Sequence, residues 1–142
     1  MGVEFLDVVD AQDEVIEQRP RTDVHLHGLR HRAAHVLVFD AAGRLLLQKR
    51  SATKDCDPGL WDSSASGHVN AGESYATCAV RELGEEIGLC LATPPEPFFK
   101  LQACVDTRNE FVWVYRCVAD GPLILNPLEI EAAGWFTPDE LE

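Results

Sequence analysis

Three glutamates, Glu82, Glu85 and Glu86, are the residues whose type and spacing first indicate chemistry. They stand at i, i+3 and i+4 in a stretch with helical periodicity, so their side chains are expected to share one helix face. Like charges at this spacing destabilise an isolated helix by roughly 0.2–0.5 kcal/mol per pair, and no basic residue follows one turn later. Mg2+ takes oxygen ligands from carboxylates, waters and phosphates. The three glutamates therefore predict a metal and phosphate site, with a solvated acidic face as the alternative.

The helix that carries these glutamates is predicted over residues 74–87. Gly88 follows it as a left-handed C-terminal cap. Apolar residues recur at steps of three and four, which indicates the face that packs on the core. The residues of this apolar stripe are Ala76, Ala79, Val80, Leu83 and Ile87. We expect the carboxylates on a face displaced from the stripe.

The other elements are mostly strands. Apolar and β-branched runs between turn residues predict strands at residues 5–9, 34–39, 44–49, 100–106, 111–118 and 134–136. Residues 40–43 and 107–109 are expected to close two hairpins. At the C-terminus, Thr137 and Glu140 form a capping-box pattern, which predicts a helix that is either a single turn or continues beyond the printed sequence.

Length and composition restrict the class of protein. A chain of 142 residues, with 46% hydrophobic and 25% charged residues, is typical of one globular domain spanning residues 1–142. A net charge of −12 repels polyanions, so we expect no nucleic-acid partner. No apolar run is long enough to cross a membrane, and the N-terminus lacks a signal-peptide pattern. Five cysteines without zinc-ligand spacing indicate reduced thiols, and we expect a cytoplasmic location.

The glutamates belong to a longer motif, GHVNAGESYATCAVRELGEEIGL, at residues 67–89. This stretch resembles the Nudix box at every defined position. The resemblance implies an α/β fold, the Nudix α/β/α sandwich, with a mixed β-sheet and the box as a loop, helix and loop. It also implies hydrolysis of a nucleoside diphosphate linked to another group, with Mg2+ or Mn2+ as cofactor. The expected partner is a small-molecule diphosphate substrate. Nudix proteins are often homodimers, whereas periodicity and charge leave the oligomeric state open.

The resemblance also implies roles for the box residues. Glu82, Glu85 and Glu86 would hold the cations together with the backbone carbonyl of Gly67. A second pair in the box, Arg81 with Glu73, would fix the helix against its preceding loop, which is a structural role.

The chemistry expected of such a site is attack of water at phosphorus. Cations neutralise the diphosphate and lower the pKa of bound water, which addresses both charge repulsion and leaving-group departure. Glu86 or Glu85 could be the catalytic base. In this family the base can also lie outside the box, where Glu110, Glu129 and Glu131 are the candidates, with a surface glutamate as the alternative for each.

Segments outside the box resemble isopentenyl diphosphate isomerase and its hydrolase-like relatives. They are HRAAHVLVF, LLLQKRSATKDCDPGLWDSSASGHV and NEFVWVY. This resemblance implies a possible second metal site at His31, His68 and Glu110, with ordinary hydrogen-bonded strand histidines as the alternative. Ser66 occupies the position of the isomerases' catalytic cysteine, and Arg108 occupies the position of an acidic ligand. The intact box and the missing thiol favour hydrolysis over isomerisation.

Two alternatives to hydrolysis stay open. The isomerase-like segments imply isomerisation of a five-carbon diphosphate, and the resemblance to Nudix domains also allows a non-catalytic nucleotide-binding module. His25 and His27 fall in a segment that we assign to a loop.

A basic cluster in this acidic chain, Lys49, Arg50 and Lys54, is predicted to bind the substrate's outer phosphate, with a solvated strand end as the alternative. Trp61 is predicted to lie in the core rather than to stack on a base. Loops at residues 51–58 and 91–97 are expected to set specificity.

Overall fold

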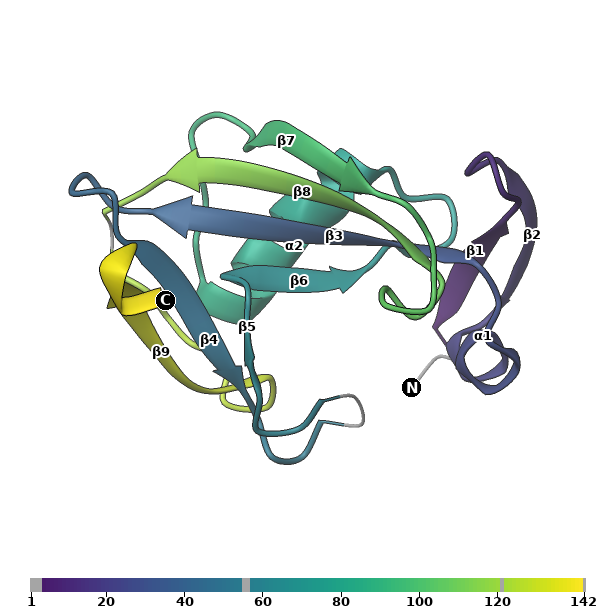
Figure 1. Cartoon of the computed structure of the whole chain (residues 1–142), viewed down its shortest axis with the longest axis horizontal. Coiled ribbons are helices and arrows are strands. Elements are labelled where there is room, and N and C mark those ends of the chain that lie inside the picture. The colour runs from purple at the N-terminus through teal and green to yellow at the C-terminus, as the bar shows by residue number, and fades with distance from the viewer. Residues whose placement is uncertain (1–3, 55–56, 121, 142) are drawn as a thin grey trace.

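A mixed β-sheet forms the centre of the fold, and it is built around one parallel pair of strands. The computed structural model describes residues 4–54, 57–120 and 122–141. The strand β3 (His31–Phe39) runs parallel to β8 (Glu110–Val118) along its whole length. An edge strand, β7 (Glu96–Leu101), pairs antiparallel with β8. The predicted α/β class with a mixed sheet is confirmed (Figure 1).

The sheet divides beyond its first hairpin. β3 and β4 (Leu45–Arg50) are paired at Phe39 and Leu45, next to the turn that residues 40–43 form as predicted. Further along, β4 pairs with β9 (Ile130–Phe136) and with the short β5 (Trp61–Asp62). β3 pairs instead with β6 (Ala65–His68). The two strands of the hairpin therefore separate, and their far ends, at His31 and Arg50, both line one pocket.

The box helix α2 (Tyr75–Ile87) crosses one face of this sheet (Figure 1). Ser74 is its N-cap and accepts a hydrogen bond from the backbone of Thr77, and Gly88 is the left-handed C-cap. The predicted bounds and C-cap are confirmed.

The predicted orientation of α2 is wrong in part. Ala76 and Val80 are exposed, and Glu82 and Glu86 lie on the buried face with the apolar residues. Helical periodicity places residues on a common face, but contact with the sheet decides how the helix is rotated. Here the rotation brings two carboxylates inward and leaves Glu85 outside.

Several strands differ from their predicted bounds. Strand β1 (Phe5–Val9) matches its prediction, whereas the strand expected at residues 100–106 is wrong beyond Leu101. β7 instead begins at Glu96, within the predicted loop, because an edge strand tolerates Pro97. β7 and β8 form the second predicted hairpin pair, with a connection from residue 102 to 109.

Four elements were not predicted. They are β2 (Val15–Pro20), α1 (Arg21–His27), β5 and β6. β2 pairs with β1 in a separate two-stranded sheet, and α1 packs on this sheet through Val24, beside Leu6 and Val8. The assignment of His25 and His27 to a loop is therefore wrong. Both lie in α1, which is too short for its period to be visible in the sequence.

The C-terminal residues form a 3-10 turn, η1 (Asp139–Leu141). Thr137 and Glu140 make the predicted capping box: the Glu140 side chain accepts from Thr137 N at 3.0 Å, and Glu140 N donates to Thr137 Oγ1 at 3.3 Å. Among the described residues, no helix is long and apolar enough to cross a membrane.

Candidate functional site

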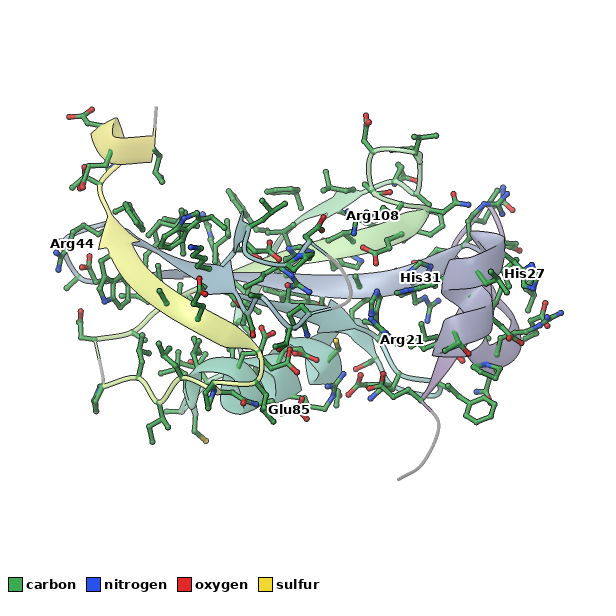
Figure 2. The ribbon with its side chains drawn as sticks, turned by 90° about the horizontal axis from the view of Figure 1, so that it is seen from below. Arg21, His27, His31, Arg44, Glu85 and Arg108 are labelled. Carbon is green, nitrogen blue, oxygen red and sulfur yellow. The ribbon has the colours of Figure 1, made fainter. Side chains whose placement is uncertain are left out.

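Of the three glutamates predicted to bind metal, Glu82 and Glu86 are buried on the side of α2 that faces β6. Glu86 Oε1 accepts hydrogen bonds from Ser66 N at 2.8 Å and from Gln48 Nε2 at 3.1 Å. Glu82 lies against Gly67, where an ideal Cβ would come within 2.2 Å of Glu82 Oε1. Only a residue without a side chain leaves this space open. Glu85 is different, because its side chain is 56% exposed and points outward from α2 (Figure 2).

Burial raises the pKa of both inner carboxyl groups. The pKa of Glu82 is raised to about 8 by burial and by the nearby charge of Glu86, against the opposing effect of Arg81. Burial also raises the pKa of Glu86 to about 7, although Ser66 and Gln48 donate to it. In both cases burial outweighs the hydrogen bonds and the positive charge that favour the anionic form. Mg2+ or Mn2+ would fit this oxygen-rich donor set of carboxylates and the Gly67 carbonyl, because a cation stabilises the anionic forms.

Arg81 links the box helix to its preceding loop. Its guanidinium donates in a fork to Glu73, at 2.8 Å and 2.9 Å, and a further bond of 3.1 Å reaches the carbonyl of His68. The same side chain donates to Glu82 at 2.7 Å and to Glu85 at 3.2 Å. The hydrogen bond to Glu73 raises the pKa of Arg81 above its ordinary value. The structure thus brings together the expected pair, and the guanidinium of Arg81 also contacts two of the glutamates predicted to bind metal, Glu82 and Glu85.

A cluster of histidines surrounds Glu110 at the other end of the pocket. His31 Nε2 lies 3.1 Å, and His68 Nε2 lies 2.9 Å, from the same oxygen, Glu110 Oε2. Burial alone would raise the pKa of Glu110, but hydrogen bonds from both histidines outweigh it and hold the pKa well below its usual range. His25, from α1, adds a third imidazole ring that lies next to the rings of His31 and His68. Figure 2 shows His31 beside this helix.

The three histidines could share a metal ion, because their ligand atoms lie within 4.8 Å of one another. His25 was missed because α1 was not predicted. The only sequence signal for it is its short separation from His31.

The three glutamates predicted to bind metal and the histidine cluster around Glu110 line one pocket of roughly 1230 Å3. Of the predicted basic cluster, Arg50 and Lys54 line this pocket, where Arg50 lies 3.4 Å from Asp62 and Lys54 pairs with Glu129. Lys49 does not line the pocket. Its Nζ atom lies 3.0 Å from Glu131 Oε2 instead.

The three candidate bases outside the box also differ in whether they line the pocket. Glu110 and Glu129 line the pocket, whereas Glu131 does not.

Three other residues noted in the sequence lie at the pocket. Ser66 donates to Asp62 at 3.3 Å, and Arg108 forms an ion pair with Asp57, which also lines the pocket. Trp61 is half exposed and contacts Phe136 edge-on, so its predicted core position is wrong. The core position fails because β5 is only two residues long and lies at the edge of the sheet.

Gln48 is a site residue that the sequence analysis missed. It is 1% exposed on β4, and it donates to Glu86 and to Ser64 O, both at 3.1 Å. A signal was present, since Gln48 alternates with Leu46 on a strand whose buried face is otherwise apolar.

Comparison with known proteins agrees with this fold. The NUDIX domain family matches residues 29–142. A Nudix hydrolase of Yersinia pestis is 37% identical over 144 residues, covering 98% of this chain and 76% of its own. An isopentenyl-diphosphate Delta-isomerase of Serratia proteamaculans is 38% identical, covering 97% and 79%. The crystal structure of DR0079 from Deinococcus radiodurans superposes with a TM-score of 0.86 at 32% identity, covering 97% and 86%. The chain therefore belongs to the NUDIX domain family and is a Nudix hydrolase.

Proposed function

We propose that this protein hydrolyses the diphosphate linkage of a nucleoside diphosphate derivative, or of a related small molecule, by attack of water at phosphorus. The observation that carries the proposal is the pair of buried carboxylates, Glu82 and Glu86, at the wall of a large pocket. These two residues, with Glu85 and the carbonyl of Gly67, would hold Mg2+ or Mn2+. Such a cation, when bound, neutralises the diphosphate and lowers the pKa of a bound water.

The basic residues of the pocket would bind and orient the substrate. Arg50 and Lys54 line the pocket, and each is paired with a carboxylate there, Asp62 and Glu129 respectively. A phosphate group could replace either carboxylate as the partner of its basic side chain, because guanidinium and ammonium groups donate strongly to phosphate oxygens.

A carboxylate of the pocket would accept the proton of the attacking water. Glu85, Glu86, Glu110 and Glu129 all line the pocket and qualify by position. Arg81 would not touch the substrate in this scheme. Its fork to Glu73 would hold α2 against the loop, so that the box carboxylates keep their positions.

The test is a turnover screen with Mg2+ or Mn2+ against nucleoside triphosphates, nucleotide sugars, ADP-ribose, dinucleoside polyphosphates and isopentenyl diphosphate. We expect turnover of a nucleotide substrate, and loss of that turnover in Glu86→Gln. Reaction in 18O-labelled water should place one labelled oxygen on a phosphate product, because the attack is at phosphorus. Nucleotide binding without turnover would instead support a non-catalytic binding module.

A second candidate function, isomerisation of a five-carbon diphosphate, is favoured by the histidine cluster around Glu110. His31 Nδ1 lies 2.8 Å from the carbonyl of Leu29 and must carry a proton to bond to it. The contact between His31 Nε2 and the Glu110 carboxylate then needs either a second proton or a metal cation between the two atoms. A metal cation there would form a second metal site at His31, His68 and Glu110. Incorporation of solvent deuterium into isopentenyl diphosphate would support isomerisation, and the hydroxyl of Ser66 in place of a thiol counts against it.

A further inference from the structure

We propose that Gln48 is a positioning residue that fixes the carboxylate of Glu86 for metal binding. The inference depends on the proposed function, because it concerns the orientation of a ligand of the proposed cation. Gln48 lies on β4 and Glu86 lies on α2, so the contact joins the helix that carries the ligands to the strand beside the pocket.

The orientation of the Gln48 amide is determined by its neighbours. Nε2 lies 3.1 Å from Ser64 O and 3.1 Å from Glu86 Oε1. A backbone carbonyl accepts hydrogen bonds but cannot donate them, so the amide nitrogen must face Ser64 O, and the same nitrogen then faces Glu86 Oε1. The flipped amide would place its oxygen against the carbonyl oxygen of Ser64.

The position of Gln48 carries a structural disadvantage. Its other polar atom, Oε1, is buried and has no hydrogen-bond partner within the described part of the chain. A buried acceptor without a partner destabilises the folded state, and a leucine or methionine of similar size would avoid that cost. A glutamine here is therefore better explained by the use of its NH2 group than by the stability of the core.

The use of that NH2 group is visible at Glu86. Gln48 Nε2 and Ser66 N both donate to Oε1 of this carboxylate. Oε2 accepts no hydrogen bond from the residues that the structure describes. Two donors on one oxygen restrict rotation of the carboxylate and leave the other oxygen for a cation, and groups that hold a ligand in this way tune metal affinity.

The experiment measures binding of Mn2+ itself, by the electron paramagnetic resonance signal of the free ion, in the protein without substrate. Gln48→Glu keeps the shape of the side chain but removes the NH2 group, and Gln48→Met removes both polar atoms. We expect each variant to raise the Kd for Mn2+ by about 10- to 100-fold, the range found when such supporting hydrogen bonds are removed.

A matched control is Gln18→Met, because Gln18 also donates its Nε2 to a carboxylate, Asp7 Oδ1 at 3.1 Å, on the β1–β2 sheet. We expect this variant to bind Mn2+ like the unmodified protein. Thermal unfolding followed by circular dichroism identifies any variant that does not fold. If Gln48→Glu does not fold, the Kd of Gln48→Met for Mn2+ tests the proposal.

The two proposals fail in different ways. If the unmodified protein binds Mn2+, Glu86→Gln loses it and the folded Gln48 variants keep it, Gln48 has no positioning role while the proposed metal site stands. If the unmodified protein does not bind Mn2+, or Glu86→Gln binds it equally well, the proposed metal site fails and the role of Gln48 fails with it.

Discussion

Gly67 lies so close to the carboxylate of Glu82 that a Cβ on Gly67 would stand 2.2 Å from Glu82 Oε1. The glycine is needed for space, and it lets strand β6 contact a buried carboxylate directly.

Gly67→Ala should therefore damage the site. The new methyl group must displace Glu82, so we expect a loss of roughly 1–3 kcal/mol in the free energy of unfolding, as for other overpacked positions. Mn2+ affinity should fall with it. Gly84→Ala is the control, because a Cβ at that exposed position of α2 meets nothing within 4 Å. Alanine should stabilise the helix there by roughly 0.5–1 kcal/mol. Urea unfolding compares the two variants, and equal stabilities would contradict the steric argument.

Arg81→Lys should destabilise the protein despite keeping the charge. A lysine cannot donate in a fork to Glu73 and also reach Glu82 and the carbonyl of His68. Losing such hydrogen bonds should lower the free energy of unfolding by roughly 1.5–3 kcal/mol. Arg44→Lys is the control: Arg44, labelled in Figure 2, lies 2.6 Å from Asp40 and its side chain is half exposed, so this substitution should cost less. A cost for Arg81→Lys no larger than this would mean that the fork is unimportant.

Because of Asp13, the free energy of unfolding should fall as the pH is lowered into the acid range. Its carboxylate is buried, which alone would raise its pKa, but Lys100, Tyr75 and Arg32 donate to it and together hold the pKa below its ordinary value. A lowered folded-state pKa contributes stability that is fully present above the unfolded pKa of about 3.9 and is lost as pH falls below it.

The variant that tests this is Asp13→Asn. Asp13 has a φ of 64°, a left-handed conformation that asparagine tolerates, so the backbone should not change. At pH 7 we expect the variant to lose roughly 3–5 kcal/mol, because three donors lose their charged partner. Urea unfolding from pH 7 to pH 3 should show the difference shrinking below about pH 4. A difference that stays constant to pH 3 would contradict the assigned pKa direction.

Metal binding should stabilise the folded protein. At a free Mn2+ concentration of 100 times Kd, we expect about 2.7 kcal/mol of added stability, measured as a rise in melting temperature that EDTA reverses. Glu86→Gln should abolish most of the rise. If Glu110→Gln abolishes it instead, the ion is held by the histidine cluster and the box glutamates do not form the main site.

Much of the box could be predicted from the sequence because its signals are local. The bounds of α2 and the left-handed cap at Gly88 depend on residues within a few turns of one another. The pairing of Arg81 with Glu73 was expected from the resemblance to the Nudix box. Strand β1 was predicted exactly, because its apolar run is bounded by turn residues. β5 and β6 were not predicted, because strands of two and four residues carry too short a pattern.

The candidate site depended more on the fold. Gln48 and Glu86 are 38 residues apart, and His31 and Glu110 are 79 apart, so no local period connects them. They meet because β3 and β4 separate and because β3 runs parallel to β8. A parallel pair brings distant segments into register, which hydrophobic patterning along the chain does not reveal.

The sequence by itself determined the family, the helix that carries the carboxylates and their spacing, because spacing along a helix is set by covalent geometry and local hydrogen bonds. Only the tertiary structure decided which carboxylates are buried, which histidines surround Glu110 and which glutamine holds Glu86. Those facts depend on how α2 is rotated against the sheet and where the strands separate, and both are set by packing between segments far apart in the chain.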